Sequence, residues 1–175
     1  MTLLFSTEAF DPAGADIPGD HRRVLDHWDT LRDGRFAPAW TEFHLDELDP
    51  AIVPWCNAVD VIDGGADFRY RFWGTMRTEV QGQEMTSKSV RDLWPPELSE
   101  SITAEYLALL ERRRPTWFDT RASAGEKHET RYQFLRLPFS SDGETIDTIF
   151  AISHNRRGPH ELSSLRKLGL VKPEA

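Results

Sequence analysis

A hairpin signal within residues 57–75 constrains the fold of this chain more than any other stretch of the sequence. Residues 57–62 alternate between apolar and polar side chains, Asp63-Gly64-Gly65 accepts the positive φ of a tight reversal, and residues 68–73 resume the alternation. The second run is expected to place Phe68, Tyr70 and Phe72 on one face and Arg69, Arg71 and Trp73 on the other. The pattern predicts an antiparallel sheet with one core face and a second face that meets water or a covering helix.

Two amphipathic helices are predicted to accompany this sheet. The first begins near Asp20, a suitable capping residue, and ends before Gly34. The second begins within Trp94-Pro95-Pro96-Glu97 and runs to about residue 113. Proline is tolerated in a first helical turn, and a carboxylate there complements the helix dipole.

Three further strands and the two chain ends complete the predicted organisation. The strands are expected at 116–122, 128–139 and 145–153, with turns at 124–125 and 141–143. A short helix is expected from Thr75 until Gly82 ends it. Residues 1–19 show little periodicity and are interpreted as an irregular N-terminal arm. Residues 20–153 form one domain in this interpretation, and residues 154–175 form a tail with a short, weakly packed helix at 162–168.

In their order and spacing these motifs resemble the PAS domain family, and within it a compact bacterial group formerly catalogued as a domain of unknown function. The resemblance covers residues 20–153. The resemblance rests on the first amphipathic helix, the Asp-Gly-Gly turn, and the segments at 68–75 (FRYRFWGT), 92–97 (DLWPPE) and 141–145 (SDGET). It implies an α+β fold with a five-stranded antiparallel sheet in the order 2-1-5-4-3 and flanking helices. It also implies a sensory or regulatory role and a pocket for a ligand, but no reaction.

Composition narrows the classes of partner. A net charge of −8 over 175 residues argues against a nucleic-acid binder held by phosphate contacts. Proteins and small molecules are therefore the expected partners, and a single cysteine suits a reducing cytoplasm. The N-terminus lacks the pattern of a signal peptide and no stretch has transmembrane length, so we expect a cytoplasmic protein without membrane association.

The sequence contains no recognisable catalytic or metal-binding constellation. Phosphate-binding, dinucleotide-binding, serine-hydrolase and zinc-protease motifs are all missing, and the histidines lack metal-ligand spacing. Cys56 has no base beside it and is interpreted as a small buried hydrophobe. The run Arg112 to Arg114 is explained by the negative end of a helix dipole without any ligand. We therefore expect a protein that is not an enzyme.

A pocket under the curved sheet is the remaining candidate site. Inward strand positions and the helical side are predicted to contribute Tyr70, Phe72, Met76, Trp94, Tyr132, Phe134 and Phe150. Equally, these side chains could simply fill the core. Haem-binding relatives take a histidine, and flavin photoreceptors a cysteine, from the lid-side helices, whereas residues 75–90 contain neither. Neither cofactor is supported.

Two functional hypotheses from different classes remain. The favoured one is a PAS signalling module that binds a small ligand or a partner protein and lacks an output domain, so that its signal leaves through that partner. The alternative is a small α+β enzyme of the NTF2-like kind, which needs an acid–base pair in its pocket. Asp119 with His128 is the pair available for it. The sheet face that carries each of these two residues separates the hypotheses.

The first helix also predicts self-association. Its apolar stripe consists of Val24, Leu25, Trp28 and Leu31. The second helix already covers the core face of the sheet, so this stripe must pack on the opposite face or against the same helix of a second chain. Because a partly exposed stripe is the kind of patch that soluble proteins bury in an interface, we expect a homodimer.

Overall fold

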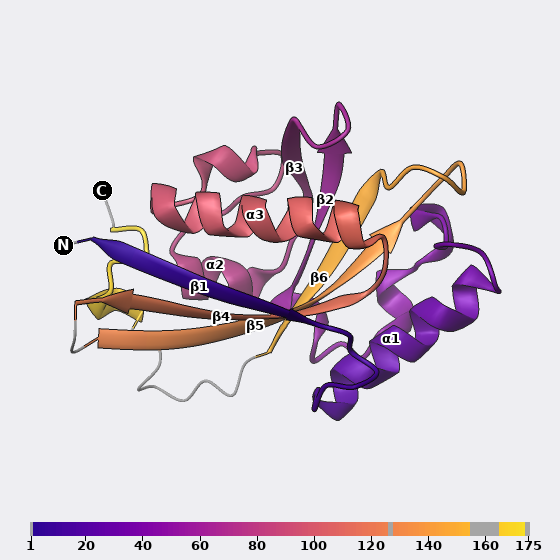
Figure 1. The fold of residues 1–175 in the computed structure, drawn as a ribbon, viewed down its shortest axis with the longest axis horizontal. Helices are drawn as coiled ribbons and strands as arrows, with labels where there is room; N and C mark the ends of the chain where they lie inside the picture. The colour runs from indigo at the N-terminus through magenta and orange to yellow at the C-terminus, as the bar shows by residue number, and fades with distance from the viewer. Residues whose placement is uncertain (1, 126–127, 155–164, 174–175) are drawn as a thin grey trace.

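The computed structural model describes residues 2–125, 128–154 and 165–173 and shows an α+β fold built on one antiparallel sheet (Figure 1). The strands are β1 (Leu3–Phe10), β2 (Cys56–Ile62), β3 (Asp67–Trp73), β4 (Thr116–Ala124), β5 (His128–Phe139) and β6 (Thr148–His154). The α-helices are α1 (Gly19–Arg32), α2 (Thr75–Gln81) and α3 (Pro96–Arg112). Short 3-10 turns lie at Trp40–Glu42, Leu45–Glu47, Val53–Trp55 and Val90–Asp92. The predicted strand positions are therefore close to those observed.

The strand order is β1-β4-β5-β6-β2-β3. Without β1, this order is the predicted 2-1-5-4-3 read from the other edge. In particular β2 pairs with β6, which joins the first and fifth strands of the prediction. The α+β PAS-like fold is confirmed, with one strand more than the five predicted.

The N-terminal arm corrects the sequence analysis. Residues 3–10 are not irregular but form β1, which pairs antiparallel with β4 from Leu3 opposite Ala124 to Phe10 opposite Trp117. Leu3 and Phe5 pack against the core, whereas Leu4 between them is 63% exposed. The alternation is present but rests on two large apolar residues, because the later positions are small or polar. The arm therefore covers the edge that β4 would otherwise expose.

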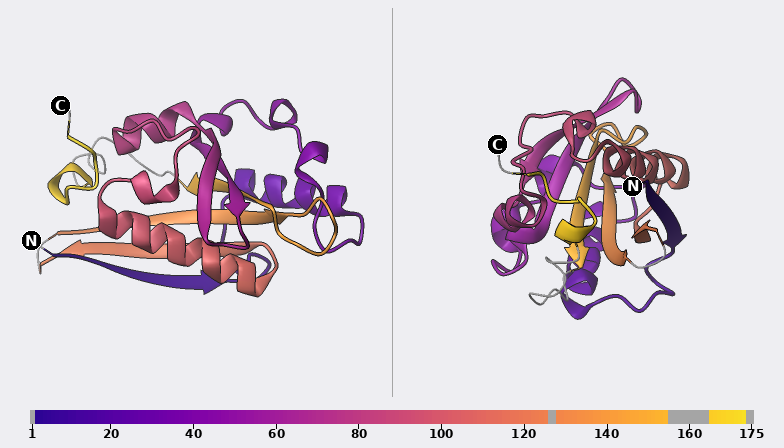
Figure 2. Two further views of the ribbon diagram at one scale, coloured as in Figure 1. Left: turned by 90° about the horizontal axis from the view of Figure 1, so that it is seen from above. Right: turned by 90° about the vertical axis from the view of Figure 1, so that its left-hand side faces the viewer.

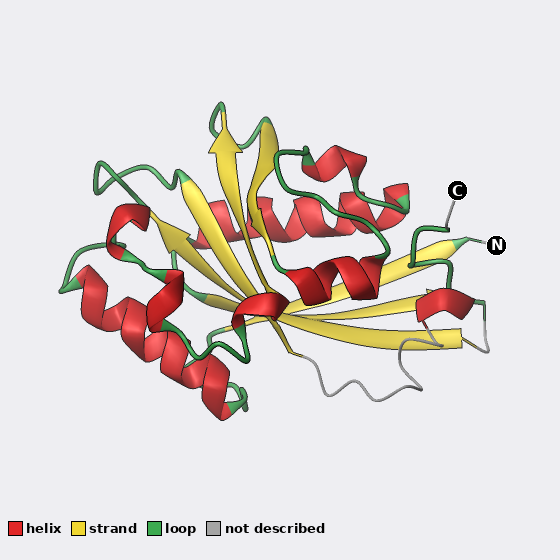
Figure 3. Cartoon of the chain, turned by 180° about the vertical axis from the view of Figure 1, so that it is seen from behind, coloured by secondary structure: helices red, strands yellow, loops and turns green. Residues whose placement is uncertain are grey.

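The two faces of the sheet are covered by different helices (Figures 1 and 2). On the inner face, α3 lies across β1, β4 and β5, and α2 follows β3. On the outer face, α1 packs with the 3-10 turns between it and β2. Figure 3 shows from behind how strongly the sheet twists between these two layers. Two hydrophobic cores result, one on each side of the sheet.

The stripe of α1 is divided by this packing. Val24 and Trp28 are buried against the outer face of the chain's own sheet, and Trp28 Nε1 donates to the Pro138 carbonyl at 2.8 Å. Leu25 and Leu31 pack at the margin of the same core and remain half-buried. Leu25 and Leu31 thus make up the accessible part of the predicted dimer stripe.

The last described segment, residues 165–173, belongs to the inner core. Leu165, Leu168 and Leu170 are buried there, and residues 165–167 are helical. The predicted helix at 162–168 is described only from Leu165 onward, since its first three residues lie outside the described ranges. Its predicted weak packing is corrected, because Leu165 and Leu168 are buried in the inner core together with residues of the sheet, α2 and α3.

Candidate functional site

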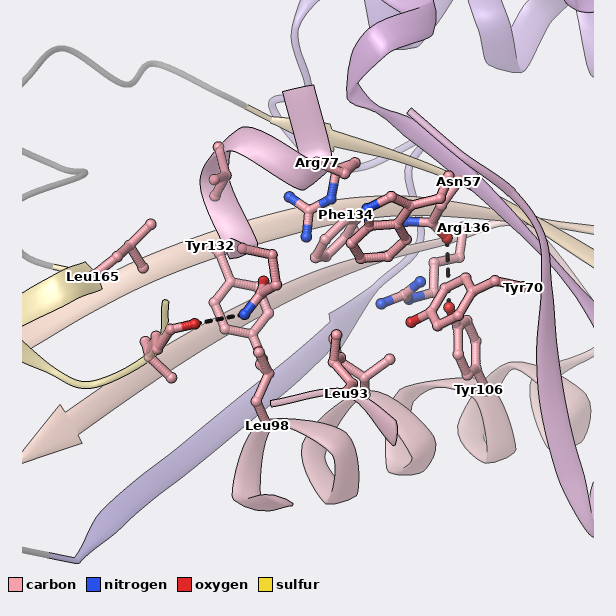
Figure 4. A pocket seen from close by; sticks show the side chains of 15 residues that line it. Asn57, Tyr70, Arg77, Leu93, Leu98, Tyr106, Tyr132, Phe134, Arg136 and Leu165 are labelled. Carbon is pink, nitrogen blue, oxygen red and sulfur yellow. Dashed lines mark hydrogen bonds between the residues drawn. The ribbon is translucent and has the colours of Figure 1, made fainter. Parts of the chain in front are cut away.

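A cavity of about 30 Å³ lies between the inner face of the sheet, α2, α3 and the segment 165–173 (Figure 4). Its wall is formed by Asn57, Tyr70, Trp73, Arg77, Val80, Gln81, Leu93, Leu98, Ile102, Tyr106, Tyr132, Phe134, Arg136, Leu165 and Leu170. A site of this size exceeds the roughly 10–15 Å³ needed for one water molecule but is well below a typical ligand pocket of about 300 Å³ or more. The cavity therefore has room for one or two water molecules.

A β-bulge determines which aromatic side chains reach the cavity. Ala58 pairs with Phe72 but the next residue, Val59, pairs with Tyr70, so Arg71 is an extra residue in β3. The bulge reverses the alternation, and Tyr70 and Trp73 therefore share the inner face although they are three residues apart. Their rings meet edge to face with centroids 4.8 Å apart.

A buried ion pair stands at the base of the cavity. The side chains of Glu105 on α3 and Arg136 on β5 are each 1% exposed. Arg136 donates from Nε and Nη2 to Glu105 Oε2 at 2.9 and 2.7 Å, and the Thr120 hydroxyl donates to Glu105 Oε1 at 2.9 Å. Burial alone would lower the pKa of Arg136, but the Glu105 carboxylate together with the neighbouring Tyr106 and Tyr70 raises it above its ordinary value. Arg136 is therefore a permanent cation in the wall.

Arg136 is held between aromatic rings. Its guanidinium carbon lies 4.5 Å from the ring centroids of both Tyr106 and Phe134. A second cation, Arg77 of α2, is 6% exposed and lies 5.3 Å from the Trp73 ring and 5.1 Å from the Phe134 ring. Such stacking fixes the direction of a guanidinium while leaving some of its N–H groups for other partners.

Three tyrosines supply hydroxyl groups around these cations. Burial raises the pKa of Tyr70, Tyr106 and Tyr132, so each is a neutral phenol at physiological pH. The Tyr106 hydroxyl donates to Asn57 Oδ1 at 3.5 Å, and the Tyr132 hydroxyl lies 3.3 Å from Ser101 Oγ. The cavity thus combines an apolar surface with oriented polar groups, as ligand sites do.

The segment 165–173 closes one end of the cavity through Gln81. Gln81 Nε2 donates to the carbonyls of Leu170 at 2.6 Å and Trp94 at 3.0 Å. The backbone N–H of Lys172 in turn donates to the Gln81 carbonyl at 3.0 Å. The Gln81 side chain therefore ties α2 to the residues just before α3 and to this segment.

The structure brings three of the predicted pocket residues, Tyr70, Tyr132 and Phe134, to the cavity wall. Phe72 and Phe150 are a correction, because both belong to the outer side of the sheet, Phe72 through the bulge and Phe150 through its pairing with Ala58. Trp94 is 40% exposed and Met76 is half-buried, and neither lines the cavity. Ligand binding by the three residues in the wall stays a prediction.

The charged residues at the cavity were not predicted from the sequence. Arg136 follows Tyr132 and Phe134 at period 2 on β5, so alternation alone places it on the inner face. Glu105 falls within the apolar face of α3, between Ile102 and Leu109. Two opposite charges therefore occupy predicted core positions, Arg136 on a strand and Glu105 on a helix. This combination is the sequence signal of a buried ion pair.

The cavity does not fit haem or flavin. Its described lining contains no histidine or cysteine, and its volume is a small fraction of what either group occupies. Cys56 lies in the outer core, where its Sγ donates to the Ile52 carbonyl at 3.2 Å and burial raises the pKa of the thiol. Among residues 2–125, 128–154 and 165–173, no group of three His, Cys, Asp or Glu side chains could hold a metal ion.

The acid–base pair of the enzyme alternative is not assembled. Asp119 pairs with Gln133 on the outer side of the sheet, where Arg131 and Gln133 donate to its carboxylate. His128 pairs with Ala124, an inner-face residue, at the far end of β5, and is exposed. Because the two residues lie on opposite faces, the observation chosen to separate the hypotheses goes against an NTF2-like enzyme.

Comparison with known proteins agrees with the fold. A family model described as "PAS domain" matches residues 19–153. Among solved structures, the chain is similar to the LOV protein of Rhodobacter sphaeroides, with 13% sequence identity, a TM-score of 0.43, and coverage of 67% of this chain and 74% of that chain. No curated protein matches significantly. Within the part of the chain that the structure describes, no helix is long and apolar enough to cross a membrane.

Proposed function

The chain belongs to the PAS domain family, and from this membership we propose that it is a non-catalytic sensory module whose inner cavity takes a small ligand. The observation that carries the proposal is the cavity itself, because it gathers two buried arginines and three neutral tyrosines at the junction of α2, α3 and the sheet. A core built only for stability rarely collects so many polar groups, since each needs a buried partner.

A ligand that enlarges the cavity would also change the surface of the protein. Leu165 and Leu170 form part of its wall, and Gln81 holds their segment to α2. A ligand larger than a few water molecules must displace part of this wall. We propose that such a displacement changes the surface that a signalling partner protein contacts, or the contact with a second copy of this chain.

Native mass spectrometry of protein purified from its own host tests the proposal directly. We expect a fraction of the molecules to carry an additional small mass that disappears on denaturation. Denatured protein of the expected mass serves as the control for covalent modification. A bare native mass from cells grown under several conditions, together with no stabilising compound in a metabolite screen, would contradict ligand sensing.

A cavity-filling variant connects that result to the site. Val80→Ile adds one methylene group at the wall, which is close to the free volume. We expect it to keep or raise thermal stability and to lose the bound mass. Val61→Ile is the matched control, because Val61 is half-buried outside the cavity lining. Equal retention of the mass by both variants would place the ligand elsewhere.

Self-association and a cytoplasmic location complete the proposed function. Leu25 and Leu31 of α1, together with Phe36, leave a half-buried apolar margin on the outer side of the molecule. A single buried cysteine suits a reducing compartment. A homodimer through α1 would place the two sensory cavities under common control.

A further inference from the structure

Two buried donors in the cavity wall have no acceptor. Arg136 Nη1 and Trp73 Nε1 each lack a partner with hydrogen-bond geometry among the described residues, although both atoms are buried. Most buried polar atoms in proteins are paired, so two orphans of the same kind in one cavity call for an explanation. Both are N–H donors, and the missing group is therefore an acceptor.

The charge of the wall specifies what kind of acceptor fits. Arg77 and Arg136 both line the cavity, and no Asp or Glu is among its described lining residues. Glu105 lies behind the wall, and its oxygens accept hydrogen bonds from the Thr120 hydroxyl and from Nε and Nη2 of Arg136. The third nitrogen of Arg136, Nη1, has no partner with hydrogen-bond geometry, although the Tyr106 hydroxyl interacts with the same guanidinium, so Nη1 is left for an acceptor within the cavity (Figure 4).

The donors are held in place before any ligand arrives. Arg136 is fixed by Glu105 and by the rings of Tyr106 and Phe134, while Trp73 is fixed by Tyr70. Donors that are already ordered in the free protein bind a charged acceptor more tightly, because no further conformational entropy is lost when the acceptor binds. The wall also has an apolar part, which includes Leu93, Leu98 and Ile102.

We propose that the ligand is a small organic carboxylate, whose oxygens accept from Arg136 Nη1 and Trp73 Nε1 and whose short apolar part contacts the leucine side of the cavity. This inference rests on the proposed ligand-sensing function and deepens it by naming the ligand class. Water is the competing occupant, since the cavity has room for one or two molecules. A carboxylate needs more space, which the wall formed by Leu165 and Leu170 can provide by moving.

Calorimetric titration of the full chain separates these possibilities with matched probes. Acetate, propionate, butyrate and benzoate are compared with acetamide, propionamide, butyramide and benzamide at constant ionic strength. We expect at least one carboxylate to bind and its amide, which has the same shape without charge, to bind about 10- to 100-fold more weakly. Tight binding of amides or other neutral compounds would overturn the carboxylate assignment and leave ligand sensing intact.

Variants place the ligand on the two donors. Trp73→Phe keeps an aromatic ring but removes Nε1, and we expect it to weaken carboxylate binding about tenfold or more and amide binding by less, because a neutral carbonyl accepts a weaker hydrogen bond. Trp94→Phe is the matched control, because Trp94 is exposed and outside the cavity lining. The double variant Glu105→Gln with Arg136→Gln removes both charges together, so the loss of binding can be read in a protein without an unpaired buried charge.

Each remaining outcome is decisive. Carboxylate binding that is unchanged by Trp73→Phe would overturn the inference. No binding of any carboxylate, combined with a bound mass in host-purified protein, means that ligand sensing holds but the class is wrong. No binding and no bound mass would remove both proposals and leave water as the occupant.

Discussion

Glu105 and Arg136 show at the residue scale how a functional group is built into a core. Each side chain is 1% exposed, and two hydrogen bonds from Arg136 to Glu105 Oε2 join them. Burial of these two charges has a desolvation cost, which well-packed apolar residues at the same positions would not have. An ion pair at this position therefore stabilises the fold weakly, but it presents one guanidinium nitrogen to the cavity.

Glu105→Gln is expected to lower the free energy of unfolding by about 3 kcal/mol, because it leaves Arg136 charged and buried without its counter-ion. Urea denaturation measures the change. Glu111→Gln, at an exposed position of the same helix, is the control and should change stability by less than about 0.5 kcal/mol. Similar effects of the two substitutions would show that Arg136 has another partner.

His21 is expected to make the protein less stable as pH falls below about 6.5. The residue is 2% exposed and its ring packs against Trp117 and His154. Burial lowers the pKa of His21 in the folded protein in spite of the neighbouring Asp20 carboxylate. In this pH range the unfolded chain binds more protons at His21 than the folded chain does. The free energy of unfolding therefore rises with pH. His21→Phe should flatten the thermal stability profile between about pH 5 and pH 7.

The exposed residue His44 provides the matched control for this profile. His44→Gln should leave the slope of stability against pH as it is in the wild type. An unchanged slope in His21→Phe would mean that another group controls stability in this range. His154, whose ring lies 5.6 Å from that of His21, is the next residue to substitute.

At the scale of elements, the β2–β3 turn depends on glycine. Gly64 and Gly65 have φ of +69° and +110°, as the sequence predicted for this turn. A Cβ at Gly64 would meet nothing within 4 Å, whereas a Cβ at Gly65 would lie 2.9 Å from Leu110 Cδ1 on α3. Gly64→Ala is therefore expected to cost about 1 kcal/mol for backbone strain alone, and Gly65→Ala more, because Leu110 must also move.

Gly19→Ala is the control for both turn variants. A Cβ there would make an ordinary contact of 3.7 Å with Arg23, and its φ is not positive. Denaturant titration should rank the loss of stability as Gly65→Ala, then Gly64→Ala, then Gly19→Ala with almost no loss. Equal effects of the two turn variants would show that the Leu110 contact is not tight.

Strand β1 provides a second prediction at this scale. Phe5 packs against the inner core while its neighbour Leu4 is 63% exposed. Phe5→Ala is expected to lower the free energy of unfolding by about 2 kcal/mol, roughly half the cost of truncating a fully buried phenylalanine. Leu4→Ala serves as the control and should change it by less than about 0.5 kcal/mol. The reverse ranking would mean that the pleat of β1 is inverted.

Elements were predictable from the sequence to the extent that they carry a strong local period or turn signal. The β2–β3 hairpin, the start of α3 and the long strand β5 each have one, and the family resemblance supplied their order. The bulge at Arg71 was not predictable, because it depends on how β2 pairs with β3 and leaves no local mark. For this reason Phe72 was assigned to the pocket in place of Trp73.

At the scale of the whole molecule, the outer side of α1 decides whether the protein is a dimer. Leu25 lies beside Pro12, Phe36 and Pro115 along a groove of about 500 Å³ on this side, which charged residues of α1 and Arg114 also line. An apolar margin of this kind is what soluble proteins usually bury in an interface. A symmetric dimer would bring the same groove of a second chain against it.

The choice of variant for testing the dimer follows from the packing of α1. Trp28 is 3% exposed and bonded to the Pro138 carbonyl, so a charge placed there would disrupt the outer core before it reported on association. Leu25→Gln with Leu31→Gln changes the half-buried part of the stripe and leaves Val24 and Trp28 in place. At micromolar concentration we expect the wild type to sediment as a dimer and this double variant as a folded monomer, with Thr30→Gln on the exposed side of α1 remaining dimeric. A monomeric wild type would exclude self-association at this concentration, and a dimeric double variant would move the interface away from α1.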